Sequence, residues 1–423
     1  MILQTNSMNL FSNNERIRKI IDLVFIVLDY VIVFLLIISR ACAWAYDENL
    51  TIKIKEIVFW LQRVLIFYIL LSFFLKSSFS LYRQQIYRFI LVLGGLVVFI
   101  YFNPINKDKF VDLYIVTFLL FVFWLLFHAN PNVIWRRYSN IVLIIACVSF
   151  IFYLFGSIIP ILPAFSTTKR VWGEWEPAVI KNFYYCYYES QYITIKGFHL
   201  WRNCSIFTEA PKYNFILCTA LASEMFLSKR LRWWSIAILV FMITTTFCTT
   251  GFVIIVLTFL FYFYNKYKNS KRWKKLLPYF KWILLGGILC IVGFFVIKFF
   301  TTRGSLGVRA DHMIACMKTF WNYKFFGAGW DNSAEVFIYA KYDQGIALGI
   351  PLIMAYGGVV LTLTLLIPFF HGFVEGVQAK QYSLLFFELI FLVHFFITII
   401  PQTLVLMMAY VVLVDVNNFE LIK

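Results

Sequence analysis

Long apolar runs alternate with short polar segments along nearly the whole chain. A helix needs roughly 20 apolar residues, each rising about 1.5 Å, to cross a hydrocarbon core of about 30 Å. The pattern therefore predicts about 12 membrane-spanning helices and an all-α polytopic fold, with residues 1–423 forming a single integral membrane domain. The predicted spans cover about 20–39, 57–75, 86–102, 110–128, 140–162, 213–227, 233–247, 250–264, 282–300, 346–370, 382–400 and 403–415.

Two long polar segments interrupt this pattern, at about 163–213 and 301–345. An even number of predicted spans separates them, so both are expected on the same side of the membrane. The other connections are short. Long ordered loops in such a protein are commonly functional.

The composition agrees with a membrane protein. Only 14% of the residues are charged and 62% are hydrophobic, whereas a soluble domain has about 25% and about 45–50%. The net charge of +17 would also suit a nucleic-acid binder. Most Lys and Arg residues, however, lie in short connections between apolar runs, as the positive-inside rule expects. Anionic membrane lipids are therefore the expected partner, and nucleic acid is not.

The same basic residues predict the orientation of the chain. Arg16, Arg18 and Lys19 precede the first span, which places the N-terminus in the cytoplasm. The most basic connection, 265–281, is expected on that side as well. The C-terminus then also lies in the cytoplasm, and the two long polar segments lie on the outer side.

Some predicted spans contain ionisable residues. Asp22 and Asp29 lie in the first span and must face protein or water. Glu388 and His394 lie in the span at 382–400 and are expected to face the interior of the bundle. There they form structural pairs or part of a substrate groove.

Motifs of the common soluble enzyme classes are absent. The sequence contains no GxxxxGKS/T or GxGxxG after a strand-like run, no HExxH and no GxSxG. No cofactor and no metal are expected. Cys186 and Cys204 lie in the same predicted outer segment, where a disulfide between them is one alternative and two free thiols are the other.

The candidate chemistry is cationic. The two outer segments contain Lys169, Arg170, Arg202, Lys212, Arg303 and Arg309, and Arg309 is followed by Asp311 and His312. An arginine presents a planar fork of donors that matches phosphate oxygens. Two facing segments of this kind could hold a pyrophosphate without a metal. The alternative is that these cations are simply solvated.

Three stretches carry a resemblance to a known family: WRNCSIFTEAPKYNFIL (201–217), TTTFCTTG (244–251) and RADHMIACMKTFWNYKFFGAGW (309–330). They resemble the O-antigen and capsule repeat-unit polymerases (Wzy-type), which are related to the O-antigen ligases. Arg202 and Glu209 match an arginine before a Phe-Thr-Glu-Pro-like turn in that family. Arg309 matches a second arginine, which precedes an amphipathic helix and a Gly-x-Gly turn.

The resemblance implies a C-type membrane glycosyltransferase at the outer face of the bacterial inner membrane. Its donor is a glycan on undecaprenyl pyrophosphate, and a sugar hydroxyl of the acceptor attacks the anomeric carbon with inversion. The product is lipopolysaccharide O-antigen or capsule. A chain-length regulator and a flippase are the protein partners that the family implies.

The resemblance also suggests residue roles. Arg202 and Arg309 bind the leaving pyrophosphate, and Arg170 and Arg303 are weaker candidates. Glu209 orients its loop or binds sugar hydroxyls. Asp311 and His312 lie within one helical turn of Arg309, where His312 is either a general base or a structural residue. Lys212, Gly327 and Gly329 complete the predicted substrate-binding set.

Two other functions compete with polymerisation. Ligases carry a His-Asn or His-Ser pair about ten residues before a Gly in the span after the second long loop, but counting back from Gly357 reaches Ile346 and Ala347 here. A lipid-linked oligosaccharide flippase should place polar groups near the midplane, often within inverted repeats. This chain has its polar content in two outer segments and shows no repeat.

Overall fold

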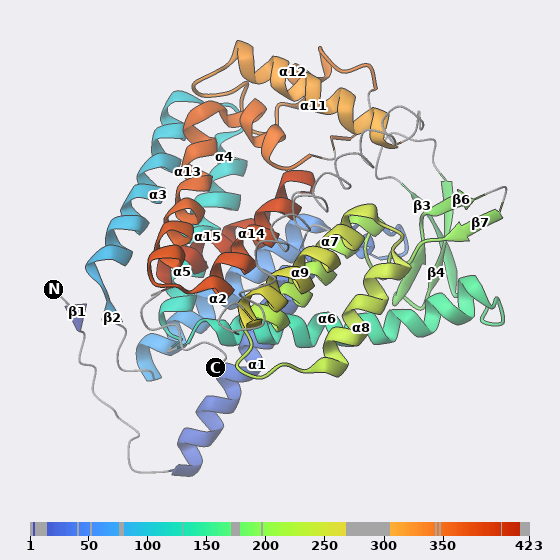
Figure 1. Ribbon diagram of the computed structural model, residues 1–423, viewed down its shortest axis with the longest axis horizontal. Coiled ribbons are helices and arrows are strands. Elements are labelled where there is room, and N and C mark those ends of the chain that lie inside the picture. Colours follow the sequence, from blue (N-terminus) through green and yellow to red (C-terminus); the bar gives the residue numbers. More distant parts are fainter. Residues whose placement is uncertain are drawn as a thin grey trace.

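The apolar runs fold into helices that pack side by side, as the computed structural model in Figure 1 shows. The structure describes residues 3–4, 15–39, 42–50, 53–75, 80–128, 130–170, 178–195, 198–267, 305–342, 345–346, 348–398 and 400–414. One continuous core of buried Leu, Ile, Val, Phe, Trp and Tyr side chains joins nearly all of the helices. Within a bilayer, close van der Waals packing of these side chains holds the helices together.

The first half of the chain forms most of the long helices. These are α1 Glu15–Ile38, α2 Ile54–Leu75, α3 Arg83–Phe102, the consecutive α4 Lys107–Phe110, π-helical turn Val111–Val116 and α5 Thr117–Leu126, and α6 Asn132–Tyr153 with a π-helical turn Leu154–Ile158. The later helices are α7 Ala210–Phe226, α8 Trp233–Thr245, α9 Thr249–Tyr267, α11 Ser305–Asn322, α12 Ser333–Phe337, α13 Ile350–Gln378, α14 Tyr382–Ile397 and α15 Pro401–Leu413.

Seven helical stretches of the described chain are long and apolar enough to cross a membrane. They are Glu15–Ile38, Glu56–Leu75, Arg83–Phe102, Lys107–Leu126, Asn132–Ile158, Thr249–Tyr267 and Ile350–Gln378. The chain is therefore a largely helical membrane protein. These helices carry many exposed large apolar side chains, which suit contact with lipid better than contact with water.

Each predicted span that falls on described residues coincides with a helix, but several of these helices are short. α8 and α15 have 13 residues each, α14 has 16 and α7 has 17, against the roughly 20 that a perpendicular span requires. α8 ends at the polar turn that begins with Thr246, and α14 ends at Thr398, before Pro401, so both are shorter than their predicted spans. α7 and α15 are at least as long as theirs. The predicted span at 282–300 lies outside the described residues.

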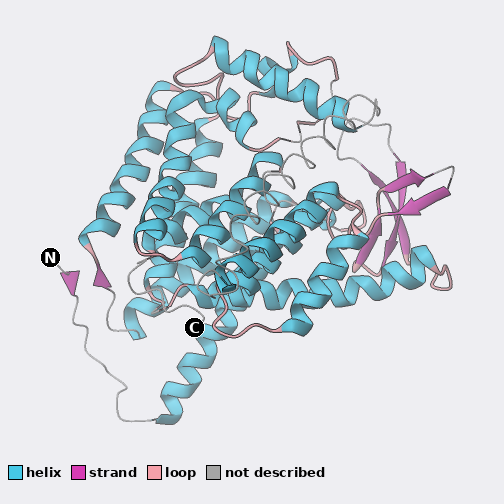
Figure 2. Cartoon of the chain, in the orientation of Figure 1, coloured by secondary structure: helices cyan, strands magenta, loops and turns pink. Residues whose placement is uncertain are grey.

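The first long polar segment contains strands, which the sequence pattern did not predict. β3 Ser166–Arg170, β4 Ala178–Phe183 and β5 Tyr187–Glu189 form an antiparallel sheet in that order, and β6 Tyr192–Ile195 pairs with β7 Phe198–Trp201. Figure 2 shows these strands grouped beside the helices. β1 Leu3–Gln4 pairs with β2 Ser80–Leu81 elsewhere. The sheets bury Phe183, Tyr187 and Tyr188.

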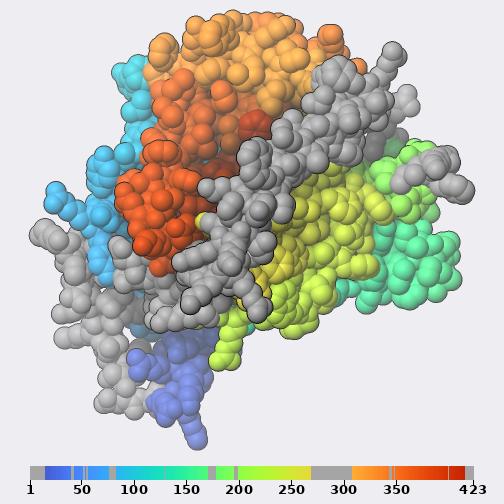
Figure 3. Space-filling view, in the orientation of Figure 1, coloured from blue at the N-terminus to red at the C-terminus, as the bar shows by residue number. Residues whose placement is uncertain are grey.

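The second long polar segment forms a helical cap. α11 and α12 lie together at one end of the bundle, next to the start of α13 (Figure 1). In the space-filling view of Figure 3, the orange surface of this region meets the cyan surface around the connection between α3 and α4.

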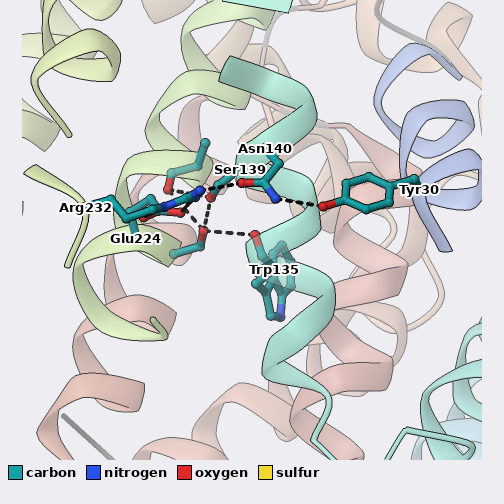
Figure 4. Close-up of polar contacts among 8 residues, drawn as sticks. Tyr30, Trp135, Ser139, Asn140, Glu224 and Arg232 are labelled. Carbon is teal, nitrogen blue, oxygen red and sulfur yellow. Dashed lines mark hydrogen bonds and ion pairs between the residues drawn. The ribbon is translucent and has the colours of Figure 1, made fainter. Parts of the chain in front are cut away.

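A buried polar network joins α1, α6, α7 and the start of α8 (Figure 4). Arg232 forms an ion pair with Glu224, which is fully buried in α7. Arg232 also donates a hydrogen bond of 2.7 Å to Asn140, whose amide donates one of 2.8 Å to the Tyr30 hydroxyl. Glu224 is tolerated within an apolar helix because its charge is paired with that of Arg232.

A second network surrounds Asp29 in α1. Its carboxylate accepts a hydrogen bond of 2.8 Å from the Trp124 indole, lies 3.0 Å from His128 and forms an ion pair with Arg137. The expectation that Asp29 faces protein is confirmed. Asp22, about two turns earlier on the same helix, is exposed.

Candidate functional site

Arg202 is the centre of the candidate site, and it directly follows strand β7. Its Nε donates a hydrogen bond of 2.9 Å to the Thr246 carbonyl oxygen, and its Nη1 donates one of 3.4 Å to Gln191 Oε1. Nη2 lies 2.8 Å from the sulfur of Cys248. These contacts hold a partly buried guanidinium in one orientation, which reduces the entropy that a ligand would have to remove.

The turn TTTFCTTG between α8 and α9 wraps around this arginine. Asn203, the residue after Arg202, donates two hydrogen bonds to Thr245: its backbone N–H to the carbonyl oxygen (3.0 Å) and its side-chain amide to the hydroxyl (3.1 Å). Phe247 has a φ of 49°, so the turn passes through the left-handed region there. Gly251 packs so closely on Asn214 that a Cβ would lie 2.2 Å from its Oδ1. The glycine lets α9 approach α7.

Gln191 connects Arg202 to the start of α7. Its Oε1 also accepts a hydrogen bond of 3.1 Å from the backbone N–H of Ala210, in the first turn of that helix. Glu209 occupies the N-cap position, and its carboxylate lies 3.8 Å from the ammonium of Lys212. The helix N-terminus therefore adds positive potential beside Arg202, whereas the Glu209 carboxylate offsets the charge of Lys212.

Arg309, in α11, comes to the same place from the second long polar segment. Its guanidinium interacts electrostatically with Cys248, Glu209 and Arg202. Burial lowers the pKa of this guanidinium, and the charge on Arg202 lowers it further, while Cys248 and Glu209 act in the opposite direction. An arginine stays protonated despite such a shift, so the site holds two permanent positive charges.

A polar layer lies next to the arginines. Arg309 also interacts electrostatically with His394 of α14, which is buried. His394 Nε2 lies 3.5 Å from the side-chain nitrogen of Asn214. The Asn214 side chain in turn contacts Thr246 (3.4 Å) and Thr250 (3.3 Å). The helix core and the cationic cluster are thus linked through hydrogen-bonding side chains.

His394 and Glu388 both face the interior, as the sequence analysis predicted, but at different places. Glu388 is buried and interacts electrostatically with Arg88 and Glu375. Only His394 belongs to the neighbourhood of Arg309.

Asp311 and His312 both hold the chain that follows α12. The carboxylate of Asp311 accepts hydrogen bonds from the backbone N–H groups of Lys341 (2.6 Å) and Tyr342 (3.2 Å). His312 is buried, and its Nε2 lies 3.1 Å from the Tyr342 carbonyl oxygen. Through these contacts both residues hold the segment around Tyr342 in place, in addition to their predicted role near Arg309.

Gly327 and Gly329 form the turn that docks α11 onto α13. Their φ values are 71° and 109°, in the region that favours glycine. A Cβ on Gly327 would lie 2.2 Å from the backbone of Tyr356. α13 is broken where it receives this turn, because Gly358 has a φ of 60° and a ψ of −157°. Close packing of two backbones thus accounts for Gly327, and close packing on the Ile105 side chain, 2.8 Å from a Cβ at position 329, accounts for Gly329, independently of any substrate.

The remaining predicted residues are placed only in part. Arg170 ends β3, and nothing is described for its side chain. Arg303 lies outside the described residues. Cys186 and Cys204 are both free thiols, so the disulfide alternative is wrong in this structure. Burial raises the pKa of the Cys204 thiol to about 11.

Arg202, Glu209, Lys212 and Arg309 were predicted as site residues from the sequence, but the groups that orient them were not. Gln191, Thr246, Cys248 and Asn214 are ordinary polar residues, and the only signal was the position of TTTFCTTG beside two arginine-bearing stretches. Among the described residues, no group of three or more His, Cys, Asp or Glu side chains could hold a metal ion. The arrangement suits an anion with several oxygens, such as a phosphate ester.

Comparisons with known proteins do not assign the chain to a family. No protein-family model matches the chain, and the sequence shows no significant similarity to the curated proteins with which it was compared.

Proposed function

We propose that this protein polymerises lipid-linked oligosaccharide repeat units, of the O-antigen or capsular polysaccharide type, by inverting glycosyl transfer. The observation that carries the proposal is the convergence of Arg202 and Arg309, which lie in separate polar segments. Arg309 interacts electrostatically with Arg202 and with Cys248, the thiol that Arg202 contacts. The donor is a glycan on undecaprenyl pyrophosphate, and the acceptor is a sugar hydroxyl of another repeat unit.

Two neighbouring guanidinium groups repel each other. Glu209 offsets part of this repulsion. A pyrophosphate between the arginines would replace the remaining repulsion by charge-assisted hydrogen bonds, each contributing about 1.5–3 kcal/mol. The site therefore favours binding of an anion.

In the proposed reaction the two arginines act on the leaving pyrophosphate. The acceptor hydroxyl oxygen forms a bond to the anomeric carbon while the bond from that carbon to the pyrophosphate oxygen breaks. The bonding pair leaves with the pyrophosphate, and the hydroxyl proton passes to a base. Negative charge grows on the leaving group, and Arg202 and Arg309 are already positioned to stabilise it.

We place this protein in the bacterial inner membrane. The chain crosses the bacterial inner membrane about 12 times, with both termini in the cytoplasm and the arginines at the outer face. The basic connections support this orientation. A polymerase placed there would receive its substrate from a flippase and would work with a chain-length regulator.

An extension assay tests the proposal. Purified protein in lipid vesicles receives the lipid-linked repeat unit without nucleotide or added metal, and glycan length is followed by gel electrophoresis. Arg202→Ala and Arg309→Ala should each abolish extension, while Arg230→Ala, at an exposed arginine, should extend normally. Full extension by both site variants would refute the assignment.

Transport of the lipid-linked oligosaccharide is the second candidate, because α13 is broken at Gly358. Transporters often use such discontinuous helices at their binding sites. The same vesicles separate the two functions: movement of unextended substrate between leaflets, without growth of the glycan, would favour transport.

A further inference from the structure

α11 carries an apolar stripe that the candidate site does not use. Ile314, Met317, Trp321 and Phe325 follow one another at intervals of three or four residues and are all exposed. This spacing places them on one side of the helix and of the turn that follows it. Trp321 is 66% exposed and Phe325 is 70% exposed. The stripe is too apolar to be an ordinary water-facing surface.

Lysines lie beside this stripe. Lys318 and Lys324 are both exposed, and the Lys324 ammonium lies 4.3 Å from the centre of the Trp321 ring. A helix with an apolar stripe, an aromatic residue and neighbouring lysines is typical of one that lies in the interface of a bilayer. Its apolar side enters the boundary with the acyl chains, and its lysines meet the phosphates.

The end of α3 lies beside the end of the stripe. α3 is long and apolar enough to span the membrane, and its last residues, Tyr101 and Phe102, are exposed. The Phe102 ring stacks on Phe326 with 4.4 Å between ring centres. Asn103, which ends α3, donates a hydrogen bond of 2.8 Å to the Phe326 carbonyl oxygen. The end of the stripe is thus fixed beside the end of a helix that is long and apolar enough to span a membrane.

α13 fixes the stripe in the same way. The backbone N–H of Val359 donates to the Lys324 carbonyl oxygen (2.8 Å), and that of Val360 donates to the Phe325 carbonyl oxygen (3.0 Å). Leu363, one turn further along this membrane-spanning helix, is exposed. The stripe therefore continues the apolar outer surfaces of two spanning helices.

We propose that α11 is an interfacial membrane helix whose stripe binds the phospholipid surface. Continuity with the exposed faces of α3 and α13 favours lipid over a protein partner, and the two lysines favour anionic headgroups. The proposal concerns only the surroundings of α11, so it stands whether or not the protein polymerises glycans.

Photocrosslinking from single positions tests this proposal. Benzoylphenylalanine replaces Trp321 or Phe325 in separate variants of the full chain, which are reconstituted into nanodiscs containing phosphatidylethanolamine and phosphatidylglycerol. Val98, exposed on α3, is the lipid-facing reference position, and Lys341, an exposed charged residue, gives the background. Adducts are identified by mass spectrometry. Each variant must elute as a folded monodisperse species before irradiation.

Positions 321 and 325 should form phospholipid adducts as position 98 does, well above the yield at position 341. Adducts at 325 should be richer in phosphatidylglycerol than the nanodisc, and Lys318→Glu with Lys324→Glu should remove that enrichment. Yields at 321 and 325 no higher than at 341 would overturn the proposal, as would crosslinks to a second copy of the chain in place of lipid.

Discussion

The Arg202 guanidinium contacts the Cys248 sulfur at 2.8 Å across the turn between α8 and α9. A thiol in an apolar run usually serves as a packing residue. Here Cys248 instead helps to orient a charged group that also donates to the backbone of Thr246. The contact ties the turn to the candidate site.

Changes at Cys248 should therefore alter glycan extension without unfolding the protein. Cys248→Val removes the contact, and a hydrogen bond to a charged group contributes about 1.5–3 kcal/mol, so the extension rate should fall about 10- to 100-fold. Cys248→Ser keeps an acceptor and should retain most of the activity. The rates are measured in the vesicle extension assay. Cys147→Val, at an exposed thiol, is the control, and equal rates for all three variants would contradict a positioning role.

The two aspartates of α1 should respond differently to the same substitution. Asp29→Asn leaves Arg137 and His128 without their anionic partner inside the bundle, and loss of one member of a buried ion pair costs about 3–5 kcal/mol. The melting temperature in detergent should fall sharply. Asp22→Asn, at an exposed position, should leave it unchanged. A similar melting temperature for both variants would show that the network contributes nothing.

The ion pair between Glu224 and Arg232 should behave as a unit. Glu224→Gln and Arg232→Gln should each destabilise the protein, because each leaves a charge unpaired. The double variant should lose less stability than the sum of the two single losses, because no uncompensated charge remains. Urea or thermal unfolding of the four proteins provides this cycle. Simple additivity would mean that the pair seen in Figure 4 is not coupled.

Two glycines provide a matched test of backbone packing. Gly327→Ala should destabilise the protein, because its φ of 71° disfavours a side chain and the Cβ would lie 2.2 Å from Tyr356; we expect a loss of more than about 1 kcal/mol. Gly94→Ala in α3 has no atom within 4 Å of its Cβ and should be neutral or stabilising. Melting temperatures decide the comparison, and an unaffected Gly327→Ala variant would argue against the tight docking of the turn.

The apolar pattern located the helices but did not show which of them are long enough to cross a membrane. The runs 233–247 and 403–415 were expected to span it, yet α8 and α15 have only 13 residues each, and the second run was no longer than that in the prediction itself. Hydropathy reports which residues avoid water but does not distinguish lipid contact from burial inside protein. α15 is buried throughout, so its apolar residues serve the core of the bundle.

The strands between 163 and 213 were missed for a related reason. Residues of β5 such as Tyr187 and Tyr188 are buried on both sides of the strand, so they show no alternation of polar and apolar positions. Their pairing partners are chosen by contacts between residues that are distant in sequence, which a local pattern does not contain.

The sequence by itself determined the class of this protein, because apolar runs of membrane length and basic connections are local properties. It also nominated Arg202 and Arg309 through short stretches of residues. Only the tertiary structure brought these two arginines together and surrounded Arg202 with Gln191, Thr246 and Cys248. Such a site depends on how α7, α9, α11 and α14 pack, and packing is decided by the fit of whole helix surfaces rather than by any one segment.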